Sequence, residues 1–327
     1  MNIVIAMATY NGGEYLLEQL TSIAQQTLTP NELIISDDNS TDNTLEIVQE
    51  FAKNAPFNVT VLKNQYNLGY TKNFNQALLA VEADFVFLCD QDDVWFQDKI
   101  EKMIKYFEAD PTVQLMIHDL AYCKQDLSPI GQTKIERMEG VFDLHQEYVV
   151  GMATALRGPF ARMCLPIPDK PGLAYDTWLH MCANALHTKK ILRDVMALYR
   201  RHNSNATATG NLNVDFVTTP EHFKTTESRT IDLIKTKTTY ENTDMPPLIT
   251  WLQERRDELL SRHYISTEDL NGMINKGVTK NSNERLRAHL LQQPLIKRIP
   301  LILRFYFFGG YKQFSGWKSA LKDILLN

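Results

Sequence analysis

The chain has 327 residues, of which 44% are hydrophobic and 22% charged, so it can bury a sizeable core as one large domain or two modest ones. Its net charge of −5 hides an asymmetry: residues 1–110 hold 6 Lys and Arg against 17 Asp and Glu, whereas residues 280–327 hold 9 against 2. The acidic front part argues against a nucleic-acid partner, because binding to a phosphate backbone needs a basic face.

The cysteine spacing and the hydropathy of the chain indicate in which cellular compartment the protein is expected. The four cysteines are widely spaced and form no CxxC pair, which excludes a zinc knuckle and a disulfide framework. The N-terminus lacks the basic region of a signal peptide, and no uninterrupted apolar run reaches the roughly 18 residues that a membrane span needs. We therefore expect a cytoplasmic protein that is neither exported nor membrane-spanning.

The first third of the chain alternates short apolar runs with helical patterns. Strands are predicted at 3–7, 33–35, 59–62 and 85–88, and helices at 15–27, 45–51, 74–81 and 100–107. This β-α-β-α order predicts an α/β fold with a mostly parallel sheet covered by helices on both faces.

The pattern loosens after residue 112. Further strands are predicted in LMIHD, GMATALRG and KILRDVMALYRRH, and a further helix in YDTWLHMCANAL. Residues 206–245 are rich in Thr, Asn and charge and predict a flexible loop or linker. Residues 246–327 predict a helical, basic C-terminal region.

Polar residues follow four successive predicted strands: Thr9 and Tyr10, then Asp37 and Asp38, then Asn67, then Asp90, Asp92 and Asp93. In open α/β sheets, ligands bind beyond the carboxyl ends of the strands, so we expect one binding site at this edge. Asp37 or Asp38 would accept a hydrogen bond from a base or a ribose there, unless both only cap a helix.

The acids after the fourth strand crowd negative charge where desolvation is costly. Mg²⁺ and Mn²⁺ take oxygen ligands and are commonly held by one or two carboxylates together with substrate phosphates. We therefore predict that Asp90 and Asp92 bind such a cation, which a diphosphate would complete. The alternative is a solvated loop in which Asp93 caps the next helix.

Four ordered segments resemble the family 2 glycosyltransferases with the GT-A fold: ATYNGGEYLLEQLTSIAQQT, ISDDNSTDNT, NQYNLGYTKNFNQA and FLCDQDDVW. With YDTWL and YRRHNSN downstream, the chain is most similar to the bacterial rhamnosyltransferase-like branch that serves cell-wall and capsular polysaccharide synthesis. The resemblance implies a GT-A domain over residues 1–205, with a nucleotide-sugar half at 1–120 and an acceptor half at 121–205.

The resemblance implies inverting sugar transfer from dTDP-L-rhamnose or a UDP-hexose to a glycan or lipid-linked oligosaccharide, with Mg²⁺ or Mn²⁺ as cofactor. Gln91 stands where the family usually has a small residue, which leaves the strictness of the metal requirement open. The implied metal ligands are Asp90 and Asp92. The implied donor-binding residues are Thr9, Tyr10, Asp37, Asp38, Asn67, Lys72, Asp90, Arg200, Arg201 and His202.

Asp176 in AYDTWL matches the position of the family's catalytic carboxylate, which would act as general base on the acceptor hydroxyl. An N-cap of the following helix is the alternative. Arg200, Arg201 and His202 would stabilise the leaving diphosphate, unless the two arginines form ordinary surface ion pairs.

The tail PLIKRIPLILRFYFFGGYKQFSGWKSALKDILL mixes aromatic, aliphatic and basic residues. Such a segment suits an anionic membrane surface, which leaves open a position at the inner face of the cell membrane. A helical pair packed on the core, or a homodimer interface, explains it equally well. A non-catalytic sugar-nucleotide-binding or scaffold subunit and a nucleotidyltransferase remain as alternative functions.

Overall fold

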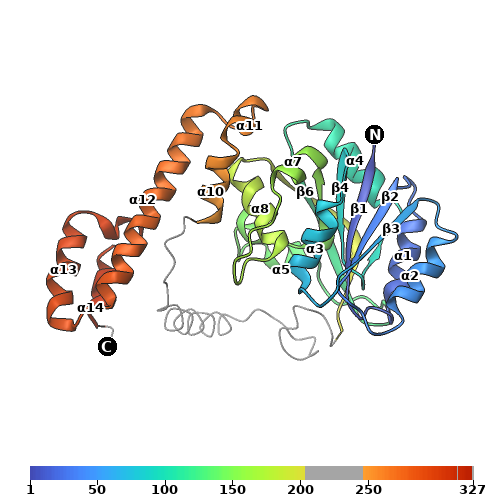
Figure 1. The fold of residues 1–327 in the computed structure, drawn as a ribbon, viewed down its shortest axis with the longest axis horizontal. Coiled ribbons are helices and arrows are strands. Elements are labelled where there is room, and N and C mark those ends of the chain that lie inside the picture. The colour runs from blue at the N-terminus through green and yellow to red at the C-terminus, as the bar shows by residue number, and fades with distance from the viewer. Residues whose placement is uncertain (203–245, 315, 326–327) are drawn as a thin grey trace. The chain divides into compact units, whose positions relative to one another are not determined.

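The computed structural model describes residues 1–202, 246–314 and 316–325 (Figure 1). These residues belong to two compact units, of which the first runs to residue 202 in its described part and the second is described from residue 246. The linker predicted at 206–245 lies outside the described residues.

An eight-stranded sheet is the centre of the first unit, in the spatial order β3-β2-β1-β4-β7-β6-β8-β5. Its strands are β1 (Ile3–Thr9), β2 (Glu32–Asp37), β3 (Asn58–Lys63), β4 (Phe85–Cys89), β5 (Val94–Trp95), β6 (Leu115–Cys123), β7 (Thr154–Arg157) and β8 (Lys189–Arg200).

The first four strands confirm the predicted parallel arrangement, because β1 pairs in parallel with both β2 and β4, and β2 with β3. The second half of the sheet is mixed. β7 lies antiparallel between β4 and β6, and β5 pairs antiparallel with β8. The predicted α/β fold is therefore confirmed, and each antiparallel pair involves β7 or β8, which lie in the region where the sequence pattern loosens.

The helices of the first unit follow the predicted alternation. They are α1 (Leu16–Ala24), α2 (Thr44–Ala52), α3 (Tyr70–Leu79), α4 (Lys99–Ala109), α5 (Lys134–Met138), α6 (Leu144–Glu147), the 3-10 helix η1 (Gly151–Ala153), α7 (Gly158–Met163) and α8 (Tyr175–Ala185). Figure 1 shows α1 and α2 on one side of β1 to β3 and α3 on the other. On α1, the fully buried Leu16, Leu20 and Ile23 form the i, i+4, i+7 stripe that attaches the helix to the core.

The second unit is helical, as predicted. Its described elements are α10 (Pro247–Glu254), α11 (Arg256–Ser261), α12 (Thr267–Leu291), α13 (Leu295–Phe307), the 3-10 helix η2 (Gly310–Gln313) and α14 (Trp317–Leu325). Throughout the described part of the chain, the helices lack the combination of length and apolar character that crossing a bilayer requires.

A small apolar cluster and a buried ion pair stabilise the end of the second unit. Ile302, Tyr311 and Ala320 form the cluster. Asp323 is fully buried and receives hydrogen bonds from Arg287 Nε and Nη2 at 2.7 Å each, and from the Tyr311 hydroxyl at 2.7 Å. A bidentate guanidinium and a phenol therefore satisfy this carboxylate.

Candidate active site

Asp37 ties the loops after β1 and β2 together. Its carboxylate accepts hydrogen bonds from Thr9 Oγ1 at 2.9 Å, from the Ser40 N–H at 2.9 Å and from Ser40 Oγ at 2.6 Å. The residue is 0% exposed. Asp37 is not the N-cap of α2, which is Asn43, and its carboxylate instead stabilises the loop with Thr9 and Ser40 as partners.

Asp38 holds the start of α3. Its carboxylate accepts hydrogen bonds from the N–H groups of Leu68 at 2.8 Å and Gly69 at 2.9 Å, and from Asn64 Nδ2 at 3.0 Å. These N–H groups lie at a helix N-terminus and lack intrahelical partners. Asn67 contributes to the same turn, because its side chain accepts a 3.0 Å hydrogen bond from Gly69.

The loop after β1 is fixed by side chains of the loop after β2. The N–H of Gly12 donates to Thr44 Oγ1 at 2.8 Å, and the N–H of Gly13 donates to Asp42 at 3.0 Å. Burial would raise the pKa of Asp42, but hydrogen bonds from Thr44 and Gly13 lower it overall. The backbone beneath the expected nucleotide position is thus held before any ligand binds.

Gln91 belongs to residues 90–93, which we call the acid segment, and connects it to the loop after β1. Its Oε1 accepts the Tyr10 N–H at 2.9 Å, and its Nε2 donates to the Tyr10 carbonyl at 3.1 Å. A side chain on Gly12 would collide with the Gln91 amide. Sequence reasoning recognised Gln91 only as a departure from the family pattern. In the structure, the longer side chain of Gln91 makes the two hydrogen bonds to the Tyr10 backbone. The Tyr10 residue itself remains 47% exposed.

Asp90 lies at the end of β4, next to other carboxylates. Burial, followed by the negative charges of Asp92 and Asp176, raises its pKa to about 7. The Tyr175 hydroxyl lies 3.5 Å from Asp90 Oδ1, at the long limit of a hydrogen bond. The structure therefore brings Asp176 close to Asp90 and Asp92, from which it is distant in the sequence.

Asp93 is more deeply buried than the sequence suggested. It is 0% exposed, its Oδ1 accepts the Arg200 N–H at 3.0 Å, and its Oδ2 has no hydrogen-bond partner in the described part of the chain. Burial and the charges of Asp92 and Asp90 raise its pKa well above the ordinary value. The alternative in which Asp93 caps α4 in a solvated loop is wrong, because Asp98 precedes the first residue of that helix.

Lys99 is a buried cation that sequence reasoning missed. It is 0% exposed, and its Nζ donates to the Met152 carbonyl at 2.7 Å and lies 3.6 Å from the centre of the Trp95 ring. Burial lowers its pKa to about 7, while the charges of Asp93 and Asp90 oppose that shift. A lysine in the first turn of a helix resembles a surface residue, so only the tertiary structure reveals this role.

Arg200 is buried and bound by other groups of the protein. Its side chain is 1% exposed; Nε donates to the Asp92 carbonyl at 2.9 Å, and the other guanidinium nitrogens bond to the Gln125 carbonyl and to Glu18. It also lies 4.6 Å from the centre of the Tyr15 ring. The expectation that Arg200 reaches the leaving diphosphate is not supported by this arrangement, and neither is a surface ion pair. Its contacts instead fix the backbone at Asp92.

His202 and Arg201 follow on the same segment. His202 Nε2 lies 2.8 Å from Asp92 Oδ2, with the two side chains only 4% and 14% exposed. The Arg201 guanidinium lies 5.7 Å from the Tyr199 ring centre and is half-buried. His202 therefore contacts the Asp92 carboxylate directly, whereas the Arg200 side chain bonds to the Asp92 backbone.

The side chains around Asp92 and His202 are of the types that bind a divalent cation. They bring one carboxylate and one imidazole together, and Asp90 adds a neighbouring carboxylate that its surroundings disfavour in the ionised form. Over residues 1–202, 246–314 and 316–325, no three His, Cys, Asp or Glu side chains are grouped as a complete metal cage. The arrangement fits the open type of site, in which substrate phosphates supply the remaining oxygens.

Asp176 lies in the first turn of α8. The helix begins at Tyr175 with Ala174 as its N-cap, so the alternative in which Asp176 is the N-cap is wrong. Its Oδ1 accepts the Thr177 N–H at 2.7 Å. Burial raises the pKa of Asp176, against the opposing hydrogen bonds from Thr177 and Gly151.

Tyr175 links Asp176 to the rest of the site. Its ring stacks on Phe74 of α3, with centroids 3.8 Å apart, and its hydroxyl lies so close to Gly151 that a side chain there would collide with it. The glycine is thus required for close approach. Lys72, by contrast, forms an exposed ion pair with Asp169 at 2.7 Å and is not brought to the acids.

Comparison with known proteins agrees with this geometry. Residues 4–148 match the family "Glycosyl transferase family 2". The chain is 41% identical over 102 residues to the dTDP-rhamnosyl transferase RfbG of Shigella flexneri, covering 30% of this chain and 35% of that one. It is 28% identical over 206 residues to an uncharacterized protein of Mycobacterium tuberculosis, covering 61% of this chain and spanning only 58% of the relative's length.

The fold has counterparts among solved structures. The crystal structure of S. aureus TarS residues 1–349 in complex with UDP superimposes with a TM-score of 0.52 at 18% identity, covering 96% of this chain and 88% of that one. Identity at this level supports the fold alone. Residues 4–148 of this chain therefore match the model of the family 2 glycosyltransferases, and the N-terminal unit has the GT-A fold.

Proposed function

We propose that this chain is an inverting glycosyltransferase that moves a hexose from a nucleoside diphosphate sugar to a hydroxyl group of a glycan or lipid-linked oligosaccharide. The observation that supports it most is the convergence of Asp90 and Asp92, after β4, with Asp176 on α8. The proposed catalytic domain spans residues 1–205, with the donor half at 1–120 and the acceptor half at 121–205.

The donor would lie over the edge formed by the loops after β1 to β4. The half-exposed Tyr10 ring offers a flat surface to the nucleotide, and the backbone beneath it is held by Gln91. Asp38 is buried and accepts three hydrogen bonds from its own protein, so its part is to fix the backbone at Leu68 and Gly69 on which the donor would lie. Thr9 and Asp37 support this floor from below.

Mg²⁺ or Mn²⁺ would be held by Asp92 and His202, with Asp90 beside them. When bound, such an ion neutralises charge on the diphosphate. The protein's own part is to hold these side chains in place, and the Arg200 contacts to the Asp92 backbone and to Glu18 serve that purpose. Arg201 is the remaining cation of this segment that we place near the leaving group.

Inversion in one displacement requires a base on the acceptor side. We assign this role to Asp176: it takes the proton of the acceptor hydroxyl as that oxygen bonds to the sugar's anomeric carbon, while the bond to the diphosphate breaks and its electron pair leaves with the phosphate. The raised pKa of Asp176 makes its carboxylate a stronger base than an exposed aspartate. Tyr175, stacked on Phe74, orients the first turn of α8.

The similarity to RfbG makes dTDP-L-rhamnose the first donor to test and a UDP-hexose the second. A thermal-shift screen of dTDP- and UDP-sugars with and without Mn²⁺ will identify the donor, because a ligand that binds only the folded state raises the melting temperature. We expect one donor class to raise it, and release of the matching nucleoside diphosphate when an acceptor glycan is added.

The scaffold alternative makes a different prediction in the same experiment. A non-catalytic subunit would bind the donor but release no nucleoside diphosphate with any acceptor tested. A shift with nucleoside triphosphates and release of pyrophosphate would instead identify a nucleotidyltransferase. All four cysteines are buried and unpaired, and we retain the cytoplasm as the proposed location.

A further inference from the structure

The last two helices of the second unit expose positive charge without negative charge. We call residues 295–325, which contain α13, η2 and α14, the basic hairpin. Its one acidic residue is Asp323, which is fully buried and bound by Arg287 and Tyr311. The one acid of the hairpin is therefore absent from its surface.

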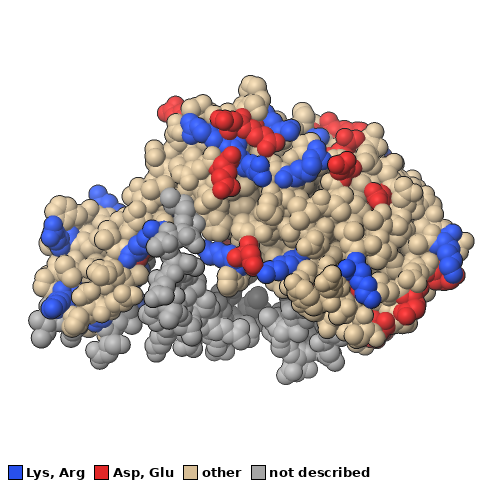
Figure 2. All heavy atoms as spheres, viewed as in Figure 1, with Lys and Arg blue, Asp and Glu red and all other residues tan. Residues whose placement is uncertain are grey.

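Five of the six basic residues of the hairpin are exposed, and the sixth, Arg298, is buried. The exposed ones are Lys297, Arg304, Lys312, Lys318 and Lys322. Figure 2 shows Lys and Arg side chains spread over the C-terminal helices at the left of the view. Salt screens such exposed charges over about 8–10 Å, so their attraction for an anionic surface is strong at close range and sensitive to ionic strength.

Large apolar side chains are exposed on the same hairpin. Phe307 and Phe308 are each 81% exposed, and Trp317 is 60% exposed. Scattered apolar residues are normal on a protein surface, but several large ones on one short element indicate an interaction site.

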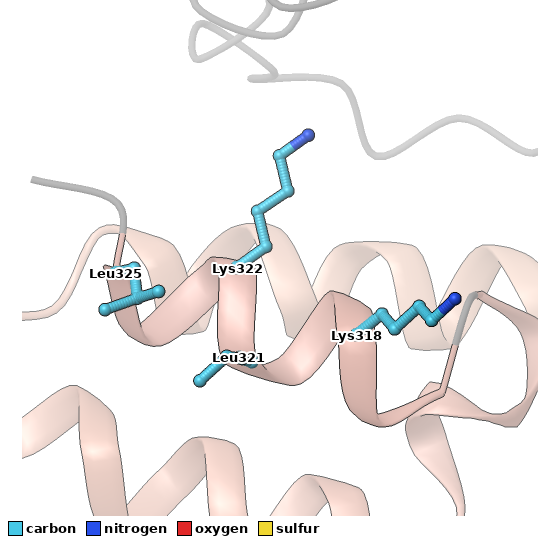
Figure 3. A pocket seen from close by; sticks show the side chains of 4 residues that line it. All are labelled: Lys318, Leu321, Lys322 and Leu325. Atoms are coloured by element: carbon cyan, nitrogen blue, oxygen red, sulfur yellow. The ribbon is translucent and has the colours of Figure 1, made fainter.

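On α14 the exposed apolar residues form one stripe. Trp317, Leu321 and Leu325 are four residues apart, and the opposite side of the helix buries Ala320 and Asp323. A shallow pocket on this face is lined by Lys318, Leu321, Lys322 and Leu325. Figure 3 shows the two lysine side chains extending from the helix beside the two leucines.

We infer that the basic hairpin docks on the anionic surface of a lipid bilayer. Amphipathic helices with Lys and Arg beside Trp, Phe and Leu bind at the boundary between headgroups and acyl chains. The charge identifies the partner as anionic, and the exposed leucines fit acyl chains better than a nucleic acid. A second copy of the chain is disfavoured because it would bring the same positive surfaces together.

This inference goes beyond sugar transfer and does not rest on it. A bilayer at the hairpin would suit a lipid-linked acceptor, but the binding is a property of the second unit alone. A failure of the hairpin to bind lipid would therefore leave the proposed activity intact, and the reverse also holds.

Vesicle flotation with the full chain tests the inference. We expect the protein to float with vesicles of phosphatidylcholine and about one-third phosphatidylglycerol, but not with phosphatidylcholine alone, and to be released by high salt. The variant Lys318→Glu/Lys322→Glu should lose at least about tenfold in partitioning, since each lysine contributes about fivefold at an anionic surface. Phe307→Ser/Phe308→Ser should lose a similar amount.

Matched controls separate the hairpin from general effects. Lys53→Glu/Lys63→Glu makes the same charge change on the first unit, and Leu17→Ser/Leu79→Ser removes exposed apolar groups there. Both should float like the unchanged protein. Equal flotation of the hairpin variants and their controls would overturn the inference, as would a chain that ignores anionic vesicles. Light scattering completes the test: a doubled mass without vesicle binding would assign the surface to a second copy.

Discussion

The two units of this protein treat buried carboxylates in opposite ways. In the second unit, Asp323 is met by a bidentate arginine and a tyrosine hydroxyl, all at 2.7 Å. In the first unit, Asp90 and Asp93 lie beside further acids, and one oxygen of Asp93 has no partner among the described groups. An unpaired buried charge is costly. The carboxylate of Asp323 is satisfied within the second unit, whereas we expect the acids of the first unit to be compensated by a bound cation.

Lys99 refines this comparison. Its ammonium group is directed to the Met152 carbonyl and the Trp95 ring, and its charge only partly compensates the acids. The charges of Asp90, Asp92 and Asp93, which we call the acid cluster, are therefore only partly compensated, whereas the charge of Asp323 is fully paired. Four variants test this difference, beginning with the one of largest effect.

Asp176→Asn should reduce sugar transfer by about 10²–10⁴-fold, the usual contribution of a positioned general base. The unfolding free energy should change little, because the isosteric amide still accepts the Thr177 hydrogen bond. Initial rates of nucleoside diphosphate release, together with circular dichroism and melting, measure both effects. Transfer within threefold of the unchanged protein would remove Asp176 from the proposed role.

Asp323→Asn should cost about 3–5 kcal/mol in the second unit, because it leaves Arg287 without its counter-charge in a buried position. Hydrogen exchange over residues 285–325 follows this loss without requiring the whole chain to unfold. The paired replacement Arg287→Met/Asp323→Leu should recover part of the loss. Unchanged exchange in Asp323→Asn would show that the ion pair is dispensable.

Asp90→Asn should change how stability depends on pH. The pKa of Asp90 is raised from 3.8 to about 7 in the folded state, so the folded protein holds a proton that the unfolded chain has released. The unfolding free energy should therefore fall as pH rises from about 4 to 7 and level off above, by on the order of 4 kcal/mol.

In Asp90→Asn that part of the slope should disappear, so that the variant gains on the unchanged protein as pH rises. Urea unfolding at pH 5 and pH 8 measures the difference. Asp98→Asn, which alters an exposed aspartate paired with Lys102, is the matched control. Parallel pH profiles of the Asp90 variant and the unchanged protein would contradict the assigned environment.

Gln91→Ala should have the smallest effect. It removes two hydrogen bonds to the Tyr10 backbone, worth about 1 kcal/mol each at most, and should weaken donor binding several-fold. Gln91→Glu keeps one of the two bonds and should fall between. Calorimetric titration with the donor nucleotide distinguishes the three proteins, and identical affinities would show that the loop is held without this amide.

Local patterns predicted the strands, the acid segment and the helical tail because each depends on residues close in sequence. The parallel order of β1 to β4 follows from the β-α alternation, and the edge where Asp90 and Asp92 lie follows from that order. The strand order in the mixed half of the sheet was harder to predict from sequence, because β7 lies between β4 and β6 through pairings that no short segment encodes.

Long-range contacts explain what the sequence did not reveal. Arg200 is buried because Glu18, Gln125 and the Asp92 carbonyl approach it from distant positions. Asp323 leaves the surface because Arg287 reaches it from α12. In both cases residue type predicted an exposed charge, and only tertiary packing decided otherwise.

The central claim is that the acid cluster is completed by a cation together with a diphosphate. Calorimetric titration of UDP and dTDP, with and without Mn²⁺, into the unchanged protein and Asp92→Asn tests it most directly. We predict that Mn²⁺ tightens binding of the preferred nucleotide by at least about tenfold in the unchanged protein and has no such effect in Asp92→Asn. Equal affinity with and without the ion in the unchanged protein would contradict the claim.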